Sequence, residues 1–396
     1  MSLSACIIVK DEEARLARCL NSINKIVDEL IVLDTGSTDR TPVIAQELGA
    51  KVYHFPWQDD FAVARNEALK YATGEWILVL DADEILVPEV IPSLLRAITL
   101  PDYLLINLIR YEAGATQSPY SLISRLFRKH PQLYFSRPYH AIIDDSLTAI
   151  LSAEPHWKIG SLPEVAIWHE GYQVDLIAQK NKTAKAQAAM EKFLDQHPTD
   201  AYVCSKLGAL YVQQGNVDRG MQLLERALSK STAEAPVLYE IHYHLGIAYR
   251  QKQAWKQAKA HYQAALSLDL LAPLKLGACI NLGNLCKEQG ELQAAQELYH
   301  TALEIDPNFA VAHYNLGMTL KAMGQFMPAI TAYQTAIQLN PNYADAYQNL
   351  GVVFLKIGKV PESLAAFGQA ISLHEQHNPA EAYRLRQGLI DMGFQV

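Results

Sequence analysis

The stretch Trp76-Ile77-Leu78-Val79-Leu80-Asp81-Ala82-Asp83-Glu84 decides the fold of the first half of this chain. Five apolar residues run without a break and then meet three carboxylates within four positions. A short apolar run that ends in charge predicts a buried central strand. The carboxylates then follow the C-terminal end of that strand, and ligands of open α/β sheets bind at this edge.

One small residue separates Asp81 from Asp83, so both side chains can reach a single bound cation. Hard divalent cations such as Mg²⁺ prefer oxygen ligands and share them with the phosphates of a substrate. The stretch therefore predicts a metal–diphosphate site on an α/β sheet. A strand that ends in a solvated acidic turn is the alternative, and these residues alone leave it open.

Length and composition indicate an ordinary globular protein of more than one domain. The chain has 396 residues, of which 50% are hydrophobic and 19% are charged. The net charge of −8 leaves no basic surface typical of proteins that bind nucleic acid or an anionic membrane.

The cysteines and the apolar segments bear on the compartment. The five cysteines are scattered and form no Cys-x-x-Cys pair, which favours a reduced, cytoplasmic environment. Charged residues 10–13 follow the first apolar run at once, so we expect no signal peptide. No apolar stretch is long enough to span a bilayer. We expect a cytoplasmic protein that would meet a membrane-linked substrate at the membrane surface.

Strand and helix patterns alternate through the first half. Strands are predicted at residues 3–9, 29–33, 52–55 and 103–111, in addition to the central one. Asp11 and Asp60 are candidate N-caps of the helices that follow them. This alternation predicts an α/β domain with a largely parallel sheet and helices on both faces.

Four motifs in this half occur together and in order. They are Ile8–Glu13, Asp34–Thr41, Asp60–Asn66 and Leu80–Glu84. Together they resemble family 2 glycosyltransferases, which have the Rossmann-like GT-A fold, over roughly residues 1–170. The resemblance implies transfer of a sugar from a nucleotide-sugar, usually UDP-linked, with inversion at the anomeric carbon.

The resemblance also implies a set of nucleotide-sugar-binding residues. Val9, Glu12 and Asp34 match positions around the nucleoside, and Arg65 and Asp81 match positions near the diphosphate. Turn formation is an alternative role for Asp34, and a surface ion pair is an alternative role for Arg65. Thr35 stands where many family members carry a second Asp.

The metal ligands implied by the resemblance are Asp81, Asp83 and His169, with Asp83 the more direct ligand of the Asp-x-Asp motif. Mn²⁺ or Mg²⁺ is the expected cofactor, and a neutral imidazole at His169 would favour Mn²⁺. The alternative for His169 is a polar contact within the fold.

The catalytic base stays open between three carboxylates. The repeat-bearing branch of the family usually has His-Glu where this chain has His140-Ala141. Asp144, Asp145 and Glu170 are the remaining candidates for a base that takes the proton of the acceptor. A solvated turn is the alternative reading of Asp144 and Asp145.

The second half is a repeat array. A Leu-Gly pair recurs with spacings of 38, 37, 34 and 34 residues, with glycines at positions 208, 246, 283, 317 and 351. Small residues and a large residue recur in phase after each pair. This period and pattern are typical of the tetratricopeptide repeat, which has one helix pair per unit.

The expected domains are a GT-A domain at 1–172, a connecting helix at 173–200, five repeats at 201–375 and a capping helix at 376–396. The connecting helix could instead be the first half-unit of the array. A terminal helix would cover an end of the solenoid that is otherwise exposed.

We therefore expect a metal-dependent, inverting glycosyltransferase whose acceptor is docked by or near the repeats, with a protein partner in the repeat groove. Similar two-part bacterial enzymes include some that modify peptides. The acceptor stays open between a protein or peptide, a glycan and a lipid-linked molecule. A non-catalytic, nucleotide-binding scaffold and a nucleotidyltransferase are the alternatives.

Overall fold

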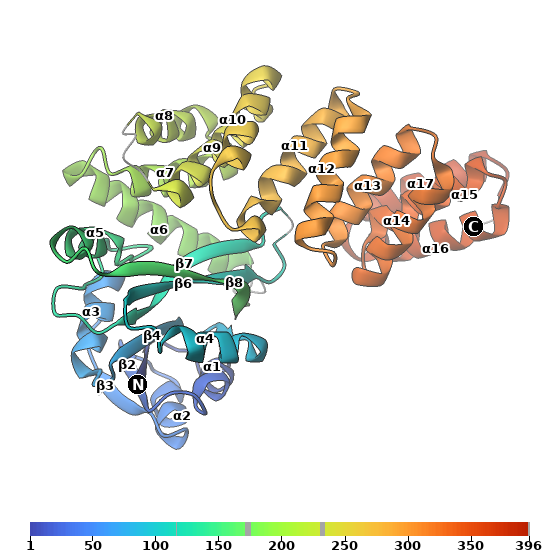
Figure 1. Cartoon of the computed structure of the whole chain (residues 1–396). Helices are drawn as coiled ribbons and strands as arrows, with labels where there is room; N and C mark the ends of the chain where they lie inside the picture. The colour runs from blue at the N-terminus through green and yellow to red at the C-terminus, as the bar shows by residue number, and fades with distance from the viewer. Residues whose placement is uncertain (116, 171–175, 230–233, 395–396) are drawn as a thin grey trace. The chain divides into compact units, whose positions relative to one another are not determined.

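A computed structural model describes residues 1–115, 117–170, 176–229 and 234–394, with the backbone alone at 176–182. The chain divides into two compact units (Figure 1). The first unit comprises residues 1–115 and 119–237, and the second comprises 116–118 and 238–396.

The first unit contains an eight-stranded sheet with the strand order β3-β2-β1-β4-β7-β6-β8-β5. Its strands are β1 (Leu3–Val9), β2 (Glu29–Asp34), β3 (Lys51–His54), β4 (Trp76–Asp81), β5 (Glu84–Leu86), β6 (Tyr103–Glu112), β7 (Tyr120–Arg128) and β8 (Lys158–His169). The predicted central strand is β4, which lies between β1 and β7 and whose apolar residues are buried.

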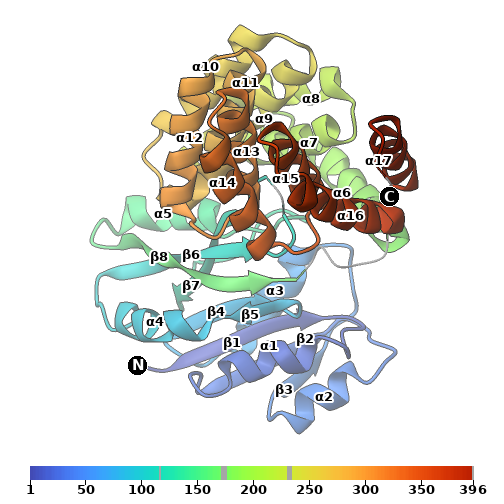
Figure 2. The same ribbon diagram turned by 90° about the vertical axis from the view of Figure 1, so that its right-hand side faces the viewer.

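The sheet is mixed, whereas the sequence predicted a largely parallel one. β1 runs parallel to β2 and β4, and β2 runs parallel to β3, so the prediction is correct for the first 81 residues (Figure 2). β7 is antiparallel to both β4 and β6, and β5 is antiparallel to β8, while β6 and β8 are parallel. The reason is that a short connection joins β6 to β7, which makes them antiparallel neighbours.

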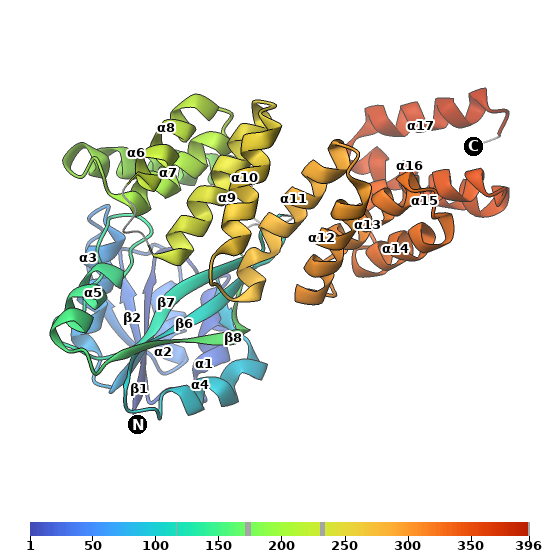
Figure 3. The same ribbon diagram turned by 45° about the horizontal axis from the view of Figure 1, so that its top comes forward.

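Helices cover both faces of the sheet, as predicted (Figure 3). The helices of the first unit are α1 (Leu16–Ile23), α2 (Thr41–Glu47), α3 (Phe61–Tyr71), α4 (Ile91–Ala97), α5 (Asp144–Ala153), α6 (Leu176–Gln196), α7 (Ala201–Gln213) and α8 (Val217–Leu228). Apolar residues of α1 and α4 form a core on one face, and those of α3 and α5 form a second core on the other.

The two predicted helix caps differ in outcome. The side chain of Asp60 accepts hydrogen bonds from the backbone N–H groups of Ala62 and Val63, so it is the N-cap of α3. Asp11 is not a cap, because α1 begins only at Leu16. Its carboxylate instead accepts from the backbone N–H of Thr38 at 2.7 Å and joins two loops at the sheet edge.

The helices of the array occur in pairs, five of them within the described residues. The first pair, α7 and α8, belongs to the first unit. The others are α9 (Ala235–Gln251) with α10 (Trp255–Ser267), α11 (Leu276–Glu288) with α12 (Leu292–Ile305), α13 (Ala310–Ala322) with α14 (Phe326–Leu339), and α15 (Ala344–Lys356) with α16 (Val360–His377). A last helix, α17 (Pro379–Asp391), packs on α16 through buried apolar residues.

The recurring glycines let the two helices of a pair approach closely. A Cβ atom built at Gly283 would lie 2.7 Å from the ring of Tyr299, and one at Gly317 would lie 2.7 Å from the ring of Tyr333. Both rings are fully buried. The small and large positions recognised in the sequence are therefore the two sides of one contact.

Two further findings bear on the sequence predictions. The predicted boundary between residues 172 and 173 lies outside the described residues. None of the described helices has both the length and the apolar character needed to cross a bilayer.

Candidate active site

The ends of four parallel strands meet at one edge of the sheet. Val9 at the end of β1 pairs with Asp34 at the end of β2, and Asp34 pairs with His54 at the end of β3. Ile8 pairs with Asp81, the last residue of β4. Parallel pairing in this register brings together the three motifs that lie at the ends of β1, β2 and β4.

Asp81 is held between two arginines. Its Oδ1 accepts a hydrogen bond from Nη2 of Arg65 at 2.8 Å, and its Oδ2 accepts one from Nη2 of Arg125 at 3.2 Å. Burial raises the pKa of Asp81, but the positive charges of Arg65, Arg125 and Arg110 outweigh it and hold the pKa well below its usual range. Asp81 is therefore ionised and faces cationic side chains of the chain itself.

Both arginines keep hydrogen-bond donors without a partner in the described part of the chain. Arg65 is 5% exposed and Arg125 is 9% exposed. Nε and Nη1 of Arg65 and Nη1 of Arg125 are buried and make no hydrogen bond there. Burial, followed by repulsion from Arg125, lowers the pKa of Arg65 to about 10. Because unpaired buried donors are costly, this arrangement favours an anionic ligand.

The resemblance found Arg65 but not Arg125. The only signal for Arg125 in the sequence is the basic and aromatic run Ser124–Lys129, which is not specific. Its role depends on the pairing of β7 with β4, where Leu126 faces Leu78 across the ladder.

The third carboxylate of the opening stretch is structural. Glu84 is fully buried, and its Oε2 accepts a hydrogen bond from the backbone N–H of Asp81 at 2.8 Å. Its Oε1 accepts from Nη1 of Arg110 at 2.8 Å. Glu84 thus fixes the turn that carries Asp81 and Asp83, a role that sequence reasoning missed.

The structure brings together two of the three predicted metal ligands. Oδ2 of Asp83 lies 3.4 Å from Nε2 of His169, the last residue of β8. The other ring nitrogen, Nδ1, contacts Oε2 of Glu112 at 2.5 Å. Burial lowers the pKa of His169, but its hydrogen bonds to Asp83 and Glu112 raise it to about 9.

Asp81 does not join these two residues, because its oxygens face the arginines. No group of three His, Cys, Asp or Glu side chains in the described ranges is arranged to hold a metal ion. Asp83 and His169 still fit a divalent cation that keeps several waters and takes its other oxygen ligands from substrate phosphates. Ligation by His169 would require the loss of its proton.

The predicted nucleoside residues line the neighbouring strand ends. Asp34 accepts from the backbone N–H of Ser37 at 3.0 Å and contacts Nδ1 of His54 at 3.1 Å. Burial raises the pKa of Asp34, but the hydrogen bonds from Ser37 and His54 outweigh it and lower the pKa. Asp34 therefore shapes the turn at Gly36, which has a φ of 105°. The contacts that Asp34 makes within the chain are thus those of a turn-forming residue, the alternative role named for it above.

Val9 and Glu12 have more local contacts. The carbonyl oxygen of Val9 accepts from both the backbone N–H and the hydroxyl of Thr35, each at 2.9 Å. Glu12 forms an ion pair with Nε of Arg15 at 3.0 Å. Nη1 of the same Arg15 lies 3.6 Å from Oδ2 of Asp83, so one side chain contacts both a predicted nucleoside residue and a predicted metal ligand. Sequence reasoning also missed Arg15.

The three candidate bases have different surroundings. Glu170 forms a bidentate pair with Arg18, with both N–O distances at 2.8 Å. Asp145 is paired with Arg137 at 2.7 Å. Asp144 accepts from the hydroxyl of Ser124 at 3.2 Å and, within the described residues, makes no ion pair. Burial raises the pKa of Asp144.

Asp144 and Asp145 lie in the first turn of α5, so they are not part of an irregular solvated turn as one alternative had it. Ala141, which replaces the Glu found in the related branch, is buried.

The sheet with its acidic edge and the helix pairs define a two-part protein, an α/β transferase domain joined to tetratricopeptide repeats. The chain belongs to the family 2 glycosyltransferases. Residues 4–160 match the family model described as Glycosyl transferase family 2. Residues 283–324 and 319–358 match a TPR repeat model, and residues 178–239 match a tetratricopeptide repeat model that includes most of α6.

Two relatives, one named for each part, support this assignment. A TPR repeat-containing protein of Synechococcus elongatus is 45% identical over 305 residues, which are 77% of this chain and 76% of the relative. An uncharacterized glycosyltransferase of Rickettsia felis is 32% identical over 196 residues, which are 47% of this chain and 69% of the relative. The solved structure of YrrB, described as a TPR protein with an unusual peptide-binding site, is 21% identical with a TM-score of 0.40 and covers 51% of this chain and 100% of its own.

The chain is therefore a glycosyltransferase. Family 2 implies a nucleotide-sugar donor, and its members generally use a divalent cation. The repeats are a fold that suits protein interaction.

Proposed function

We propose that the chain is a metal-dependent, inverting glycosyltransferase that transfers a sugar from a UDP-linked donor to an acceptor docked by or near the repeats. The observation that carries this proposal is the pair Arg65 and Arg125, which clamp Asp81 and keep buried N–H groups free to bind an anion. Guanidinium groups match the geometry of phosphate oxygens. Two of them placed where the diphosphate departs would stabilise its growing negative charge.

The cation would be held by Asp83 and His169, with Mn²⁺ favoured over Mg²⁺ by the imidazole nitrogen. When bound, it would neutralise charge on the leaving diphosphate as a Lewis acid. The nucleoside would lie along the ends of β1 and β2, where Val9, Glu12 and Asp34 are found.

We propose Asp144 as the base. The carboxylates of Asp145 and Glu170 are each held by an arginine, Arg137 and Arg18 respectively, so they are not oriented toward an acceptor hydroxyl. Asp144 has no such partner in the described part of the chain, and partial burial raises the pKa of its carboxyl. A base on the face of the sugar opposite the diphosphate would take the proton of the attacking acceptor hydroxyl, and displacement from that face inverts the anomeric carbon.

The test measures UDP release from a panel of UDP-sugars by the full chain, with Mn²⁺ or with EDTA. We expect at least one donor to be turned over, with loss of activity in EDTA and in the Asp83→Ala variant. Asp102→Ala is the matched control, because Asp102 pairs only with exposed Lys158 in the described structure. Equal activity with Mn²⁺ and with EDTA would overturn the metal dependence.

A nucleotide-binding scaffold without turnover is the second candidate, and Ala141 in place of the expected Glu favours it. Stabilisation of the chain by UDP with no release from any donor would support the scaffold. Formation of a nucleotide-sugar from a sugar 1-phosphate and a nucleoside triphosphate would instead indicate a nucleotidyltransferase. Both outcomes contradict the proposed transfer.

A further inference from the structure

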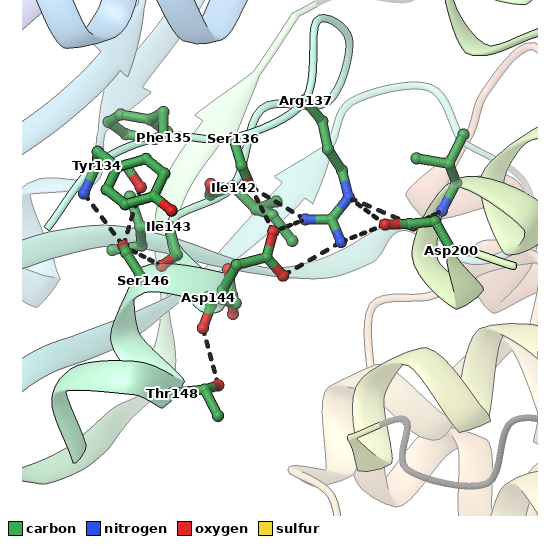
Figure 4. A network of polar contacts seen from close by, with 12 residues as sticks. Tyr134, Phe135, Ser136, Arg137, Ile142, Ile143, Asp144, Ser146, Thr148 and Asp200 are labelled. Atoms are coloured by element: carbon green, nitrogen blue, oxygen red, sulfur yellow. Dashed lines mark hydrogen bonds and ion pairs between the residues drawn. The ribbon is translucent and has the colours of Figure 1, made fainter. Parts of the chain in front are cut away.

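One guanidinium connects the catalytic domain to the first repeat. Arg137 lies in the segment 133–143, which is the larger part of the connection from β7 to α5. Its Nη1 donates to Oδ2 of Asp145 at 2.7 Å, and its Nη2 donates to Oδ2 of Asp200 at 2.8 Å (Figure 4). Further bonds of Nη2 to Asp145 and of Nε to Asp200, both at 3.2 Å, complete the pairing. The guanidinium also lies 5.1 Å from the ring centre of Tyr202.

The two carboxylates belong to elements far apart in the sequence. Asp145 is in the first turn of α5, directly after Asp144. Asp200 is the N-cap of α7, the first helix of the first repeat, where its Oδ1 accepts from the backbone N–H of Val203 at 2.8 Å. Only 8% of the Arg137 side chain is exposed. Arg137 therefore holds the start of α5 against the start of the repeats, and all these residues lie in one compact unit.

The backbone of the segment is strained and held at several points. Arg137 has a φ of 74° and His140 has a φ of 53°. Residues other than Gly rarely adopt this left-handed backbone region. Ser136 and Ile142 exchange two backbone hydrogen bonds at 2.8 and 3.2 Å. The carbonyl of Pro138 accepts from the backbone N–H of Phe61, the first residue of α3, at 3.0 Å. A strained backbone persists where its surroundings determine it this strongly, and such segments cluster at functional sites.

The segment also contacts the donor side of the proposed site. Arg65 lies on α3, the helix that is hydrogen-bonded to the carbonyl of Pro138. Asn66 of the same helix exchanges two hydrogen bonds with the backbone of Phe135, at 2.8 and 2.9 Å. The guanidinium of Arg65 lies 5.3 Å from the ring centre of Phe135. The segment thus lies between the helix of the diphosphate arginine and the helix of the proposed base.

We propose that Arg137 is a positioning residue for the transfer reaction. By bridging Asp145 and Asp200, it uses the first repeat to set the position of Asp144 relative to the bound donor. This inference rests on the proposed function, because it takes Asp144 as the base. It implies that the first repeat, besides any docking role, is part of the scaffold of the catalytic site.

The test uses the full chain, with the UDP-sugar that it hydrolyses fastest as the donor and water as the acceptor. The variants are Arg137→Ala, Arg137→Lys and Asp200→Ser. Serine can still cap α7, but it cannot pair with Arg137. Lysine keeps the charge, but it cannot present a planar fork to two carboxylates. Arg226→Ala is the matched control, since Arg226 lies on α8 and its side chain forms, within the described ranges, one hydrogen bond, to the carbonyl of Pro198 at 3.3 Å.

We expect Arg137→Ala and Asp200→Ser to lower kcat about 10- to 100-fold, with Arg137→Lys between them and the natural chain. The dissociation constant for UDP should change less than about threefold, because the donor arginines are intact. The acid limb of the pH–kcat profile should shift in both variants, which a loss of stability alone would not cause. The double variant Arg137→Ala/Asp200→Ser should lower kcat no further than Arg137→Ala does alone, because both changes break the same ion pair.

If Asp200→Ser folds with an unchanged kcat and an unchanged acid limb, Arg137 does not position the base, although the proposed function stands. If the natural chain releases UDP from no donor, the proposed function itself fails. Should Arg137→Ala fail to fold, Asp200→Ser and Arg137→Lys decide the question.

Discussion

Nη2 of Arg125 donates a hydrogen bond to Oδ2 of Asp81 at 3.2 Å. The two residues are 44 positions apart and meet only because β7 runs antiparallel beside β4. The first carboxylate of the Asp-x-Asp motif is thus bound to arginines of the chain. This relationship separates two roles within the motif, since Asp81 orients the anion-binding guanidiniums while Asp83 faces His169.

Arg125 is predicted to contribute to donor binding. In the Arg125→Lys variant, Asp81 keeps a cation but the donor loses a guanidinium contact. Loss of a hydrogen bond to a charged group costs about 1.5–3 kcal/mol, so the dissociation constant for UDP should rise roughly 10- to 100-fold. Titration calorimetry measures it. Arg96→Lys on α4 is the control, because within the described residues the side chain of exposed Arg96 forms a hydrogen bond only with Ser93, at 3.2 Å. UDP affinity equal to that of the natural chain would place the diphosphate elsewhere.

Asp144 and Glu170 are predicted to respond differently to neutralisation. Asp144→Asn should lower kcat by roughly 10²- to 10⁴-fold, the usual contribution of a positioned base. Glu170→Gln should have a small effect, because Glu170 is engaged by Arg18. UDP affinity should be unchanged in both. A loss of turnover in Glu170→Gln that matches Asp144→Asn would argue against Asp144 as the base.

The pH dependence of turnover offers an independent check of the base. Burial raises the pKa of Asp144 above its ordinary value. The base must be ionised, so kcat should fall as the pH drops through this raised pKa, at a higher pH than for an exposed Asp. A steady-state pH–kcat profile measures the limb. The limb should disappear in Asp144→Asn, and its persistence there would assign it to another group.

Glu29 is predicted to stabilise the fold without affecting catalysis. It is the first residue of β2, so it lies at the opposite end of the strand from Asp34 and the candidate site. Burial raises its pKa, but hydrogen bonds from Lys51, Thr73 and Ser4 outweigh it and lower the pKa to about 2. Because the pKa of Glu29 is lower in the folded state, its ionised form stabilises the protein at pH values above its ordinary pKa of 4.5. This stabilisation is lost as the pH falls toward 2.

Glu29→Gln should therefore destabilise the protein by about 2 kcal/mol at pH 7, after solvent screening at the exposed Lys51. Urea unfolding of both forms at pH 7 and pH 4 measures the difference. The difference in the free energy of unfolding between the natural chain and Glu29→Gln should be smaller at pH 4 than at pH 7. The turnover of the variant should equal that of the natural chain. A gap that stays constant with pH would mean that Glu29 acts through packing and not through its charge.

The close approach within each repeat should make its glycine intolerant of a methyl group. In Gly283→Ala the new Cβ would meet the buried ring of Tyr299, whose hydroxyl donates to Asn284 at 2.7 Å and so resists movement. Overpacking of this kind costs about 1–3 kcal/mol, so the melting temperature of the array should fall.

Gly368→Ala in α16 is the matched control for this substitution. A Cβ at that position meets no atom within 4 Å, so the helix should gain up to about 1 kcal/mol from the better helix former. Equal melting temperatures for the two variants would contradict the proposed packing.

Much of the fold was readable because it depends on local patterns. The strands from Leu3 to Asp81, the cap at Asp60 and the repeat period each follow from neighbouring residues, and all appear in the structure. The mixed order of β5 to β8 was not readable, because antiparallel pairing between distant segments leaves no local period. The prediction that Asp11 is an N-cap was wrong, because its carboxylate accepts a hydrogen bond from Thr38 in the loop after β2.

The sequence by itself determined the α/β domain, the repeat array and the edge of the sheet at which Asp34, Asp81 and Asp83 gather, since side-chain periodicity and strand ends are local properties. Only the tertiary structure decided that Arg125 and Arg15 reach this edge, that Glu84 is structural and that Asp144 alone of the three candidate bases lacks an arginine partner within the described residues. These outcomes depend on burial and charge pairing between segments that approach one another only in the folded chain.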